Sequence, residues 1–349
     1  MQYRQLGATN EKLSAIGLGT MTWGEQNTKQ EAFDQMAFAC DMGVNFFDVA
    51  EMYPVPPKAE TYGDTETIIG QWFAKNPSKR DQIFLASKVA GPSDAMGAYI
   101  RDGNLGFDRK NIEQALHDSL KRLQTDRIDL YQLHWPARSA NFFGKLGFAP
   151  EDQDGELVSL LNTLQVLDDL MKQGKIRHIG LSNETAWGAM HALHLADKHN
   201  LPKIVSVQNP YNLLNRTYEV GLAEVSYRES IGLLAYSPLG FGVLTGKYRN
   251  GAKPKKARLT LFDRFSRYLN PQAQLATEMY LTMADDFEIS PVDLALGFVN
   301  SRPFVTSNII GATTLEQLKQ NIASVNFELT SDMLDRVQSI HQAMSNPAP

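Results

Sequence analysis

The sequence has few of the features that mark a secreted or membrane protein. Its 349 residues include one cysteine, Cys40, so no disulfide can form within the chain. No run of about 18 apolar residues occurs and no targeting pattern stands at the start, so we expect a cytoplasmic protein without a membrane partner. The net charge of −5 gives no overall positive field for nucleic acid, which favours small-molecule chemistry.

Patterns typical of several other sites are also missing. The glycine cluster at 17–24, GLGTMTWG, follows an apolar run but lacks the G-x-G-x-x-G spacing of an open dinucleotide-binding sheet. No G-x-S-x-G sequence supports a serine hydrolase. The histidines His191, His194 and His199 lack the zinc-protease pattern, and the acidic run at 151–156 lacks calcium-loop spacing. We therefore expect no metal site.

Apolar runs of strand length alternate with helical patterns along the whole chain. The expected strands are 13–19, 44–48, 83–89, 128–134, 176–182, 203–209, 232–238 and 305–311. The expected helices are 28–42, one from 64, one from 108, 157–173, one from 183, 217–229, those within 272–301, and 314–324. Such alternation predicts parallel pairing, and eight repeats close into a barrel. We predict one domain, 1–349, with the α/β fold of a (β/α)8 TIM barrel, an N-terminal hairpin across 2–14 and an extra helix at 330–345.

Polar side chains stand at the ends of three consecutive expected strands. Asp48, Lys88 and His134 end the second, third and fourth strands, and Tyr53 follows Asp48 by five residues. Consecutive parallel strands are neighbours, and barrel sites are built where their carboxyl ends meet. A buried carboxylate needs a partner, and Lys88 is the candidate partner of Asp48.

These four residues suggest proton delivery to a carbonyl oxygen. An unperturbed phenol has a pKa of about 10, and a nearby ammonium lowers it, so we expect Lys88 to lower the pKa of Tyr53. Asp48 would hold the ammonium, and His134 would hydrogen-bond the carbonyl oxygen. No side chain supplies hydride, so the reaction needs a nicotinamide cofactor. Each residue taken alone could have a purely structural role. Asp48 could cap a loop and Lys88 could be solvated, while Tyr53 could pack against the prolines and His134 could lie in the core.

With these residues in place, the sequence resembles the aldo-keto reductases. The segments FFDVAEMY, ASKV and YQLHWP stand at the family's motif positions, and Asp48, Tyr53, Lys88 and His134 match its catalytic tetrad. Within the family the chain is similar to the Tas-type, NADPH-dependent bacterial reductases, which also resemble β subunits of voltage-gated potassium channels. The resemblance implies NADPH-dependent reduction of aldehydes or ketones to alcohols, with Tyr53 as the general acid. The alternatives are a cofactor-binding regulatory subunit that senses redox state, or a scaffold without cofactor.

The resemblance also implies a set of NADPH/NADP⁺ contacts. The expected cofactor-binding residues are Gly19, Thr20, Ser182, Asn183, Gln208, Tyr236, Ser237, Leu239, Gly240, Thr245, Lys247, Arg258, Thr313, Gln317 and Asn321. In the family, Tyr236 stacks on the nicotinamide and Arg258 lies near the 2′-phosphate. Gln317 departs from the arginine of many relatives, so NADPH over NADH is an expectation to be tested. A glycine-rich solvent loop is the alternative for the segment after Tyr236.

Aromatic residues near the expected rim are candidates for the substrate pocket. Trp23, Trp135 and the segment 141–148, NFFGKLGF, could form its apolar wall around a small carbonyl compound. Ordinary packing remains the alternative for each. Nothing in the sequence indicates an oligomeric state.

Overall fold

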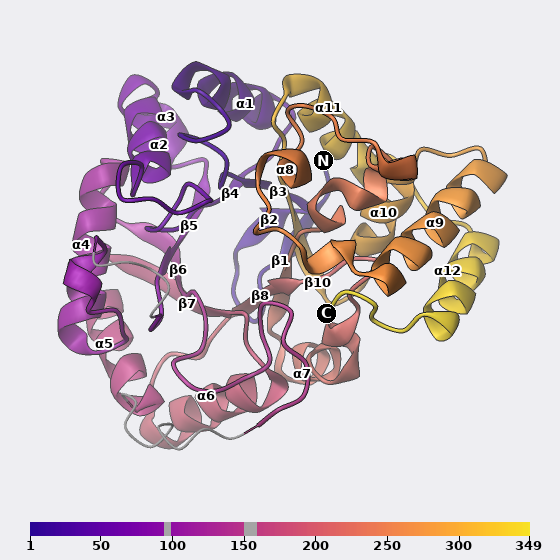
Figure 1. Ribbon diagram of the computed structural model, residues 1–349. Helices are drawn as coiled ribbons and strands as arrows, with labels where there is room; N and C mark the ends of the chain where they lie inside the picture. Colours follow the sequence, from indigo (N-terminus) through magenta and orange to yellow (C-terminus); the bar gives the residue numbers. More distant parts are fainter. Residues whose placement is uncertain (94–98, 150–158) are drawn as a thin grey trace.

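A computed structural model describes residues 1–93, 99–149 and 159–349. Within these residues eight parallel strands form a closed barrel with helices outside it (Figure 1). The barrel strands are β3 (Ile16–Gly19), β4 (Phe46–Asp48), β5 (Phe84–Val89), β6 (Ile128–Leu133), β7 (Ile176–Ser182), β8 (Ser206–Pro210), β9 (Gly232–Tyr236) and β10 (Val305–Ile310). Each pairs with the next, and β10 pairs with β3 to close the ring. The predicted (β/α)8 TIM barrel is confirmed.

The helices follow the strands in the predicted alternation. They are α1 (Lys29–Asp41), α2 (Asp64–Lys75), α3 (Pro77–Arg80), α4 (Arg109–Leu123), α5 (Leu160–Lys172), α6 (Ala186–His199), α7 (Leu222–Glu229), α8 (Arg258–Leu261), α9 (Pro271–Asp286), α10 (Pro291–Asn300), α11 (Leu315–Ala323) and α12 (Ser331–Ala343). The short helices α3 and α8 were not predicted. The start of α6 was predicted at Asn183, three residues too early. Asn183 has a left-handed φ of 54°, and Thr185 caps the helix by accepting from the Gly188 amide at 3.3 Å.

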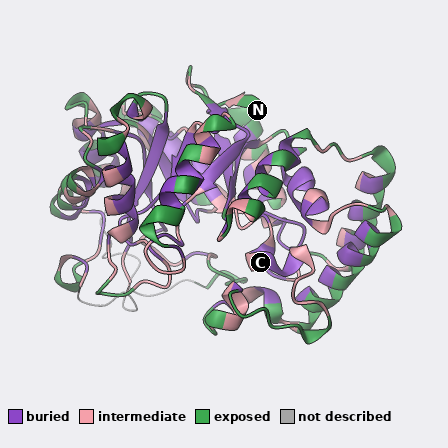
Figure 2. Ribbon diagram, turned by 90° about the horizontal axis from the view of Figure 1, so that it is seen from above, coloured by how far each residue is buried: buried purple, intermediate pink, exposed green. Residues whose placement is uncertain are grey.

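An N-terminal hairpin closes one end of the barrel. Strands β1 (Tyr3–Gln5) and β2 (Lys12–Ser14) pair antiparallel, as predicted. The buried Leu6 and Leu13 pack with side chains of the barrel interior, such as Phe46. Burying one such leucine stabilises the fold by about 1.5–3 kcal/mol. Figure 2 shows the N-terminus on one side of the barrel and the C-terminus toward the other, so the hairpin leaves the end with the long loops free.

The extra C-terminal helix, α12, packs beside α9 through the buried residues Met333, Val337 and Ile340. The chain then returns to the loops: the Ala348 amide donates to the Leu214 carbonyl at 3.1 Å, and Asn270 Nδ2 donates to the Pro347 carbonyl at 2.8 Å. The last residues therefore border the open end of the barrel.

Strand register brings the polar strand ends together at that end. Asp48 pairs with Ala86, Lys88 pairs with Gln132, and Ser182 pairs with Gln208. These residues are all buried.

Two further features concern the membrane and the single cysteine. Among the described residues, no helix combines the length and apolar character needed to cross a bilayer. Cys40 on α1 is half-buried, and burial raises the pKa of its thiol to about 11. The thiol is therefore protonated at neutral pH and a poor nucleophile.

Candidate active site

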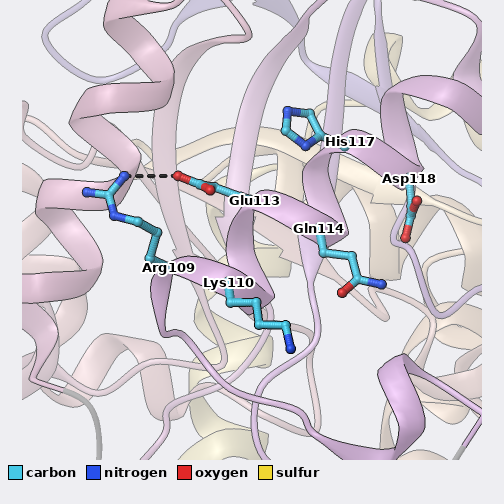
Figure 3. Close-up of a pocket in the computed structure, with 6 residues that line it drawn as sticks. All are labelled: Arg109, Lys110, Glu113, Gln114, His117 and Asp118. Carbon is cyan, nitrogen blue, oxygen red and sulfur yellow. Dashed lines mark hydrogen bonds and ion pairs between the residues drawn. The ribbon is translucent and has the colours of Figure 1, made fainter.

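The candidate site is a cavity of about 1520 Å³ at the carboxyl end of the barrel strands. Drug-sized ligand pockets span about 300–1,000 Å³, so this cavity has room for a larger ligand. A second, shallower pocket lies along the outer face of α4, where Figure 3 shows six polar side chains. There Arg109 forms exposed ion pairs with Glu113 at 2.9 Å and with Asp169 at 2.7 Å. Exposed pairs of this kind are typical of a solvated helix surface, so the functional candidate is the barrel cavity.

Asp48 is the centre of a buried polar network at the base of the cavity. Lys88 Nζ donates to Asp48 Oδ2 at 2.7 Å and to the Val49 carbonyl at 2.9 Å. Gln208 Nε2 donates to Asp48 Oδ1 at 2.7 Å, and Gln132 Nε2 lies 3.4 Å from the same oxygen. The predicted pairing of Asp48 with Lys88 is confirmed. Because both charges are almost completely removed from water, each depends on the other for compensation.

Tyr53 packs over this ion pair. The Lys88 ammonium lies 5.1 Å from the centroid of the Tyr53 ring, and the His134 ring meets the Tyr53 ring edge-on at 5.9 Å. The prediction that the pKa of Tyr53 lies below its ordinary value is wrong. Burial raises the pKa of Tyr53, the Asp48 charge raises it further, and only the Arg258 charge opposes them. Lys88 is itself neutralised by Asp48, so Tyr53 holds its proton firmly at neutral pH.

His134 is a neutral imidazole in this site. Burial lowers the pKa of His134 well below its usual range, and the Lys88 charge lowers it further. Its Nδ1 is buried and has no hydrogen-bond partner within the described residues. The imidazole lines the cavity beside the Tyr53 ring, so it can hydrogen-bond a ligand atom there.

The buried His134 predicts a loss of stability in mild acid. The unfolded chain takes up a proton below a pKa of about 6.5 and the folded chain resists it, so stability falls as pH drops below that value. One such histidine contributes a slope of at most about 1.4 kcal/mol per pH unit. Urea unfolding should be measured at one pH above and one pH below the histidine pKa. The free energy of unfolding should fall less between these two pH values for His134→Gln than for the parent. His178 and His341, whose pKa values burial also lowers, remain in both proteins; equal acid losses would contradict the assignment.

Most of the predicted site residues line the cavity. Those that do are Asp48, Tyr53, His134, Trp135, Gly19, Thr20, Ser182, Asn183, Gln208, Tyr236, Ser237, Leu239, Thr245, Lys247, Arg258, Thr313, Gln317 and Asn321. Several are already linked: Tyr236 donates its hydroxyl proton to Asn183 Oδ1 at 2.6 Å, and Ser182 Oγ donates to the Gln208 carbonyl at 2.9 Å. The structure thus brings together residues from six strand ends.

Three predicted residues do not line the cavity. Lys88 lies beneath Asp48 and is fully buried. Trp23 belongs to the hydrophobic core, where its Nε1 donates to Gln35 Oε1 at 3.2 Å, so the prediction of a substrate wall there is wrong. Gly240 is buried behind the loop and donates its amide proton to the Ser237 carbonyl at 2.9 Å. That amide already has an acceptor, so it is not free to donate to a cofactor.

Trp135 does line the cavity as expected. Its Nε1 donates to the Pro92 carbonyl at 2.9 Å, which fixes the ring. The ring lies 5.0 Å from the His134 ring and 5.9 Å from the Phe143 ring, measured between centroids. An aromatic wall therefore extends from His134 into the segment 141–148.

Two cations border the loop after β9. Gly242 has a left-handed φ of 95°, and a side chain there would come within 2.8 Å of Lys247 Nζ, so glycine lets this ammonium lie against the loop. Burial lowers the pKa of Lys247, with a smaller effect from the Arg258 charge. The Arg258 guanidinium lies over the rings of Phe241 and Phe265, 5.5 and 5.3 Å from their centroids. Two neighbouring cations fit a pyrophosphate.

The far end of the cavity lies where α1 and α11 begin. Asn27 Nδ2 donates to the Thr313 carbonyl at 2.9 Å, and the Thr313 amide donates to Gln317 Oε1 at 2.9 Å. Glu31 lines this end of the cavity. A hydrogen bond from the Thr28 amide lowers the pKa of Glu31, and the charge of Lys256 lowers it slightly further. Lys256 therefore reaches this end. Arg258 acts instead on Tyr53 and Lys247, so its charge lies toward the middle of the cavity.

The sequence reasoning missed Gln132, Lys256 and Arg267. Gln132 had a signal, because it stands two residues before His134 and strand periodicity puts both on one face. Lys256 belongs to a basic run whose members look alike in sequence. Arg267 follows no pattern and lines the cavity through the fold of its loop.

Comparison with known proteins gives matches over nearly the whole chain. The profile of the aldo/keto reductase family matches residues 15–342. The chain is 55% identical to Protein tas of Escherichia coli K12 over 349 residues, covering 100% of both proteins. It is 31% identical to the uncharacterized oxidoreductase YrpG of Bacillus subtilis, covering 100% of this chain and 98% of that protein. It is 30% identical to a putative voltage-gated potassium channel subunit beta of Schizosaccharomyces pombe, covering 97% and 92%. The family profile spans every barrel strand.

Proposed function

Because the chain belongs to the aldo/keto reductase family, whose members are oxidoreductases that generally use NAD(P)H, we propose that it reduces aldehydes or ketones to alcohols with NADPH. The observation that carries this proposal is the buried Asp48–Lys88 pair under Tyr53, beside a neutral His134, at the base of a large cavity.

Tyr53 would act as the general acid. Its high pKa keeps the hydroxyl protonated at neutral pH, so it can give a proton to an oxygen that becomes negative during reduction. His134, being neutral, would hydrogen-bond the same oxygen without competing as a base. Lys88 would stabilise the phenolate left on Tyr53, and Asp48 would hold Lys88 in position.

The residues present fit a nicotinamide dinucleotide, which when bound would supply hydride to the carbonyl carbon. Tyr236, Asn183 and Gln208 would surround the nicotinamide end, since they lie on the strand ends next to His134. Lys247 and Arg258 would bind the pyrophosphate. Residues at the start of α11 and the nearby Lys256 would hold the adenosine end.

The function is tested by following NADPH oxidation against a panel of aldehydes, ketones and dicarbonyls. We expect turnover with several members of the panel. If no member is reduced while NADPH binds tightly, the proposal fails.

The similarity to a channel β subunit favours one alternative, a cofactor-binding regulatory subunit. It predicts tight NADPH binding, negligible reduction of any carbonyl compound and a protein partner that co-purifies. The reductase proposal predicts turnover without a partner, so the same panel separates the two.

The choice of NADPH over NADH should depend on Lys256. Its ammonium lies at the adenosine end, where NADPH carries a phosphate that NADH lacks. An exposed ion pair is worth up to about 1 kcal/mol, so Lys256→Gln should weaken NADPH binding several-fold and leave NADH binding unchanged. Fluorescence titration gives both dissociation constants. Lys253→Gln, outside the cavity lining, is the control; equal affinities for both nucleotides in the parent protein would contradict the preference.

A further inference from the structure

Arg267 lies on the cavity wall, where it hydrogen-bonds the hydroxyls of Tyr236 and Tyr268 but forms no ion pair with a carboxylate of the described residues. It begins the 3-10 turn Arg267–Leu269, and its Nη1 is buried with no hydrogen-bond partner in the described residues. Arg122 and Arg216, by contrast, have carboxylate partners: Arg122 pairs with Glu66 at 2.8 Å and Arg216 with Glu219 at 2.7 Å. An anionic ligand would stabilise a guanidinium that has no carboxylate partner.

The carboxylates that line the same cavity are engaged elsewhere. Asp48 pairs with Lys88, Glu25 pairs with Lys58, and Glu31 accepts from the Thr28 amide at 2.7 Å. No ion pair joins Arg267 to a described carboxylate, although Pro349 also lines the cavity and its oxygen borders the same position beside Gly144 as Arg267 Nε does. The Arg267 charge lies close to Tyr236, which also lines the cavity. Burial raises the pKa of Tyr236, and the Arg267 charge is the largest of the effects that lower it.

Arg267 lies at the end of the aromatic wall that starts at the reacting oxygen. Successive ring contacts run from Tyr53 to His134 at 5.9 Å, from His134 to Trp135 at 5.0 Å and from Trp135 to Phe143 at 5.9 Å. The next residue, Gly144, is so close that a side-chain carbon there would lie 3.4 Å from Arg267 Nε. A molecule lying along this wall would meet Tyr53 at one end and Arg267 at the other.

We propose that Arg267 binds the carboxylate of the substrate, so that the preferred substrates are carbonyl compounds carrying an apolar body and a carboxylate. This inference rests on the proposed reductase function. The planar guanidinium offers two parallel N–H donors that match a carboxylate, and the aromatic wall would contact the apolar body.

The test compares acids with their neutral esters. The probes are 3- and 4-carboxybenzaldehyde and their methyl esters, which sample two distances between aldehyde and carboxylate. A hydrogen-bonded charge pair corresponds to about 10- to 100-fold in binding, so Arg267→Gln should lower the acid-to-ester ratio of kcat/KM by that factor, mainly through KM. Arg228→Gln removes an exposed charge outside the cavity lining and should leave the ratio unchanged.

The outcomes separate this inference from the proposed function. If the parent protein reduces neither acids nor esters, the reductase function fails. If it reduces esters and the ratio does not change in Arg267→Gln, only the carboxylate site is overturned. An equal loss for acid and ester together with weaker NADPH binding would assign Arg267 to the cofactor and also overturn it. If circular dichroism shows that Arg267→Gln folds poorly, Arg267→Lys replaces it in the test. Lysine keeps the charge but lacks the two parallel N–H donors, so the acid-to-ester ratio should be intermediate. An unchanged ratio in Arg267→Lys would count against the site.

Discussion

Replacing Tyr53 with phenylalanine is expected to lower turnover by about 10²- to 10⁴-fold, the range typical of losing a general acid. Phenylalanine keeps the ring that packs on His134 and Lys88 and removes only the hydroxyl. No hydrogen bond to that hydroxyl occurs in the described part of the chain, so the fold and the cavity should persist. The rate of NADPH oxidation at saturating aldehyde measures the loss.

A second tyrosine provides the matched control for this substitution. Tyr62 donates to Glu51 Oε2 at 3.2 Å and lies outside the cavity lining, so Tyr62→Phe should leave turnover close to that of the parent. NADPH binding, followed by fluorescence, should be the same in all three proteins. Near-normal turnover in Tyr53→Phe would falsify the role of Tyr53. A large loss of NADPH affinity in the same variant would show instead that the hydroxyl supports the cofactor.

The strand-end residues could be found from sequence because two regularities fix them. The repeating strands and helices predict a parallel barrel, and in a parallel barrel the ends of neighbouring strands meet. Asp48, Lys88 and His134 therefore had to converge once the strands were recognised. The pairing of Asp48 with Lys88 then followed from the cost of burying either charge alone.

The pKa of Tyr53 and the loop residues could not be found in this way. The pKa depends on how much water reaches the hydroxyl, and burial outweighs every nearby charge. The long loop after β9 has no periodic pattern; its path depends on contacts such as Arg258 over Phe265 and Asn270 with the Pro347 carbonyl. The sequence could not distinguish core from cavity for Trp23, because the residue lies in a loop where strand periodicity does not apply.

The Asp48–Lys88 pair joins the stability of the barrel to its chemistry. Lys88 approaches the Tyr53 ring only because Asp48 and the Val49 carbonyl hold its ammonium. The pair is also costly to break, since Asp48 would keep its charge with only the amides of Gln208 and Gln132 as donors. Stability and turnover should therefore both respond to Lys88, but through different effects.

Substituting Lys88 with methionine should destabilise the protein by about 3–5 kcal/mol, the cost of leaving one buried charge without its partner. Urea unfolding measures this loss, and the exposed Lys172→Met, which breaks a pair with Asp168, should change stability by less than about 1 kcal/mol. Adding Asp48→Asn to Lys88→Met removes the stranded charge and should recover most of the stability. Turnover should stay low in the double variant, because no ammonium remains beside Tyr53. Recovery of both properties would mean that the pair acts only in folding, and an unchanged stability in Lys88→Met would contradict the buried pair itself.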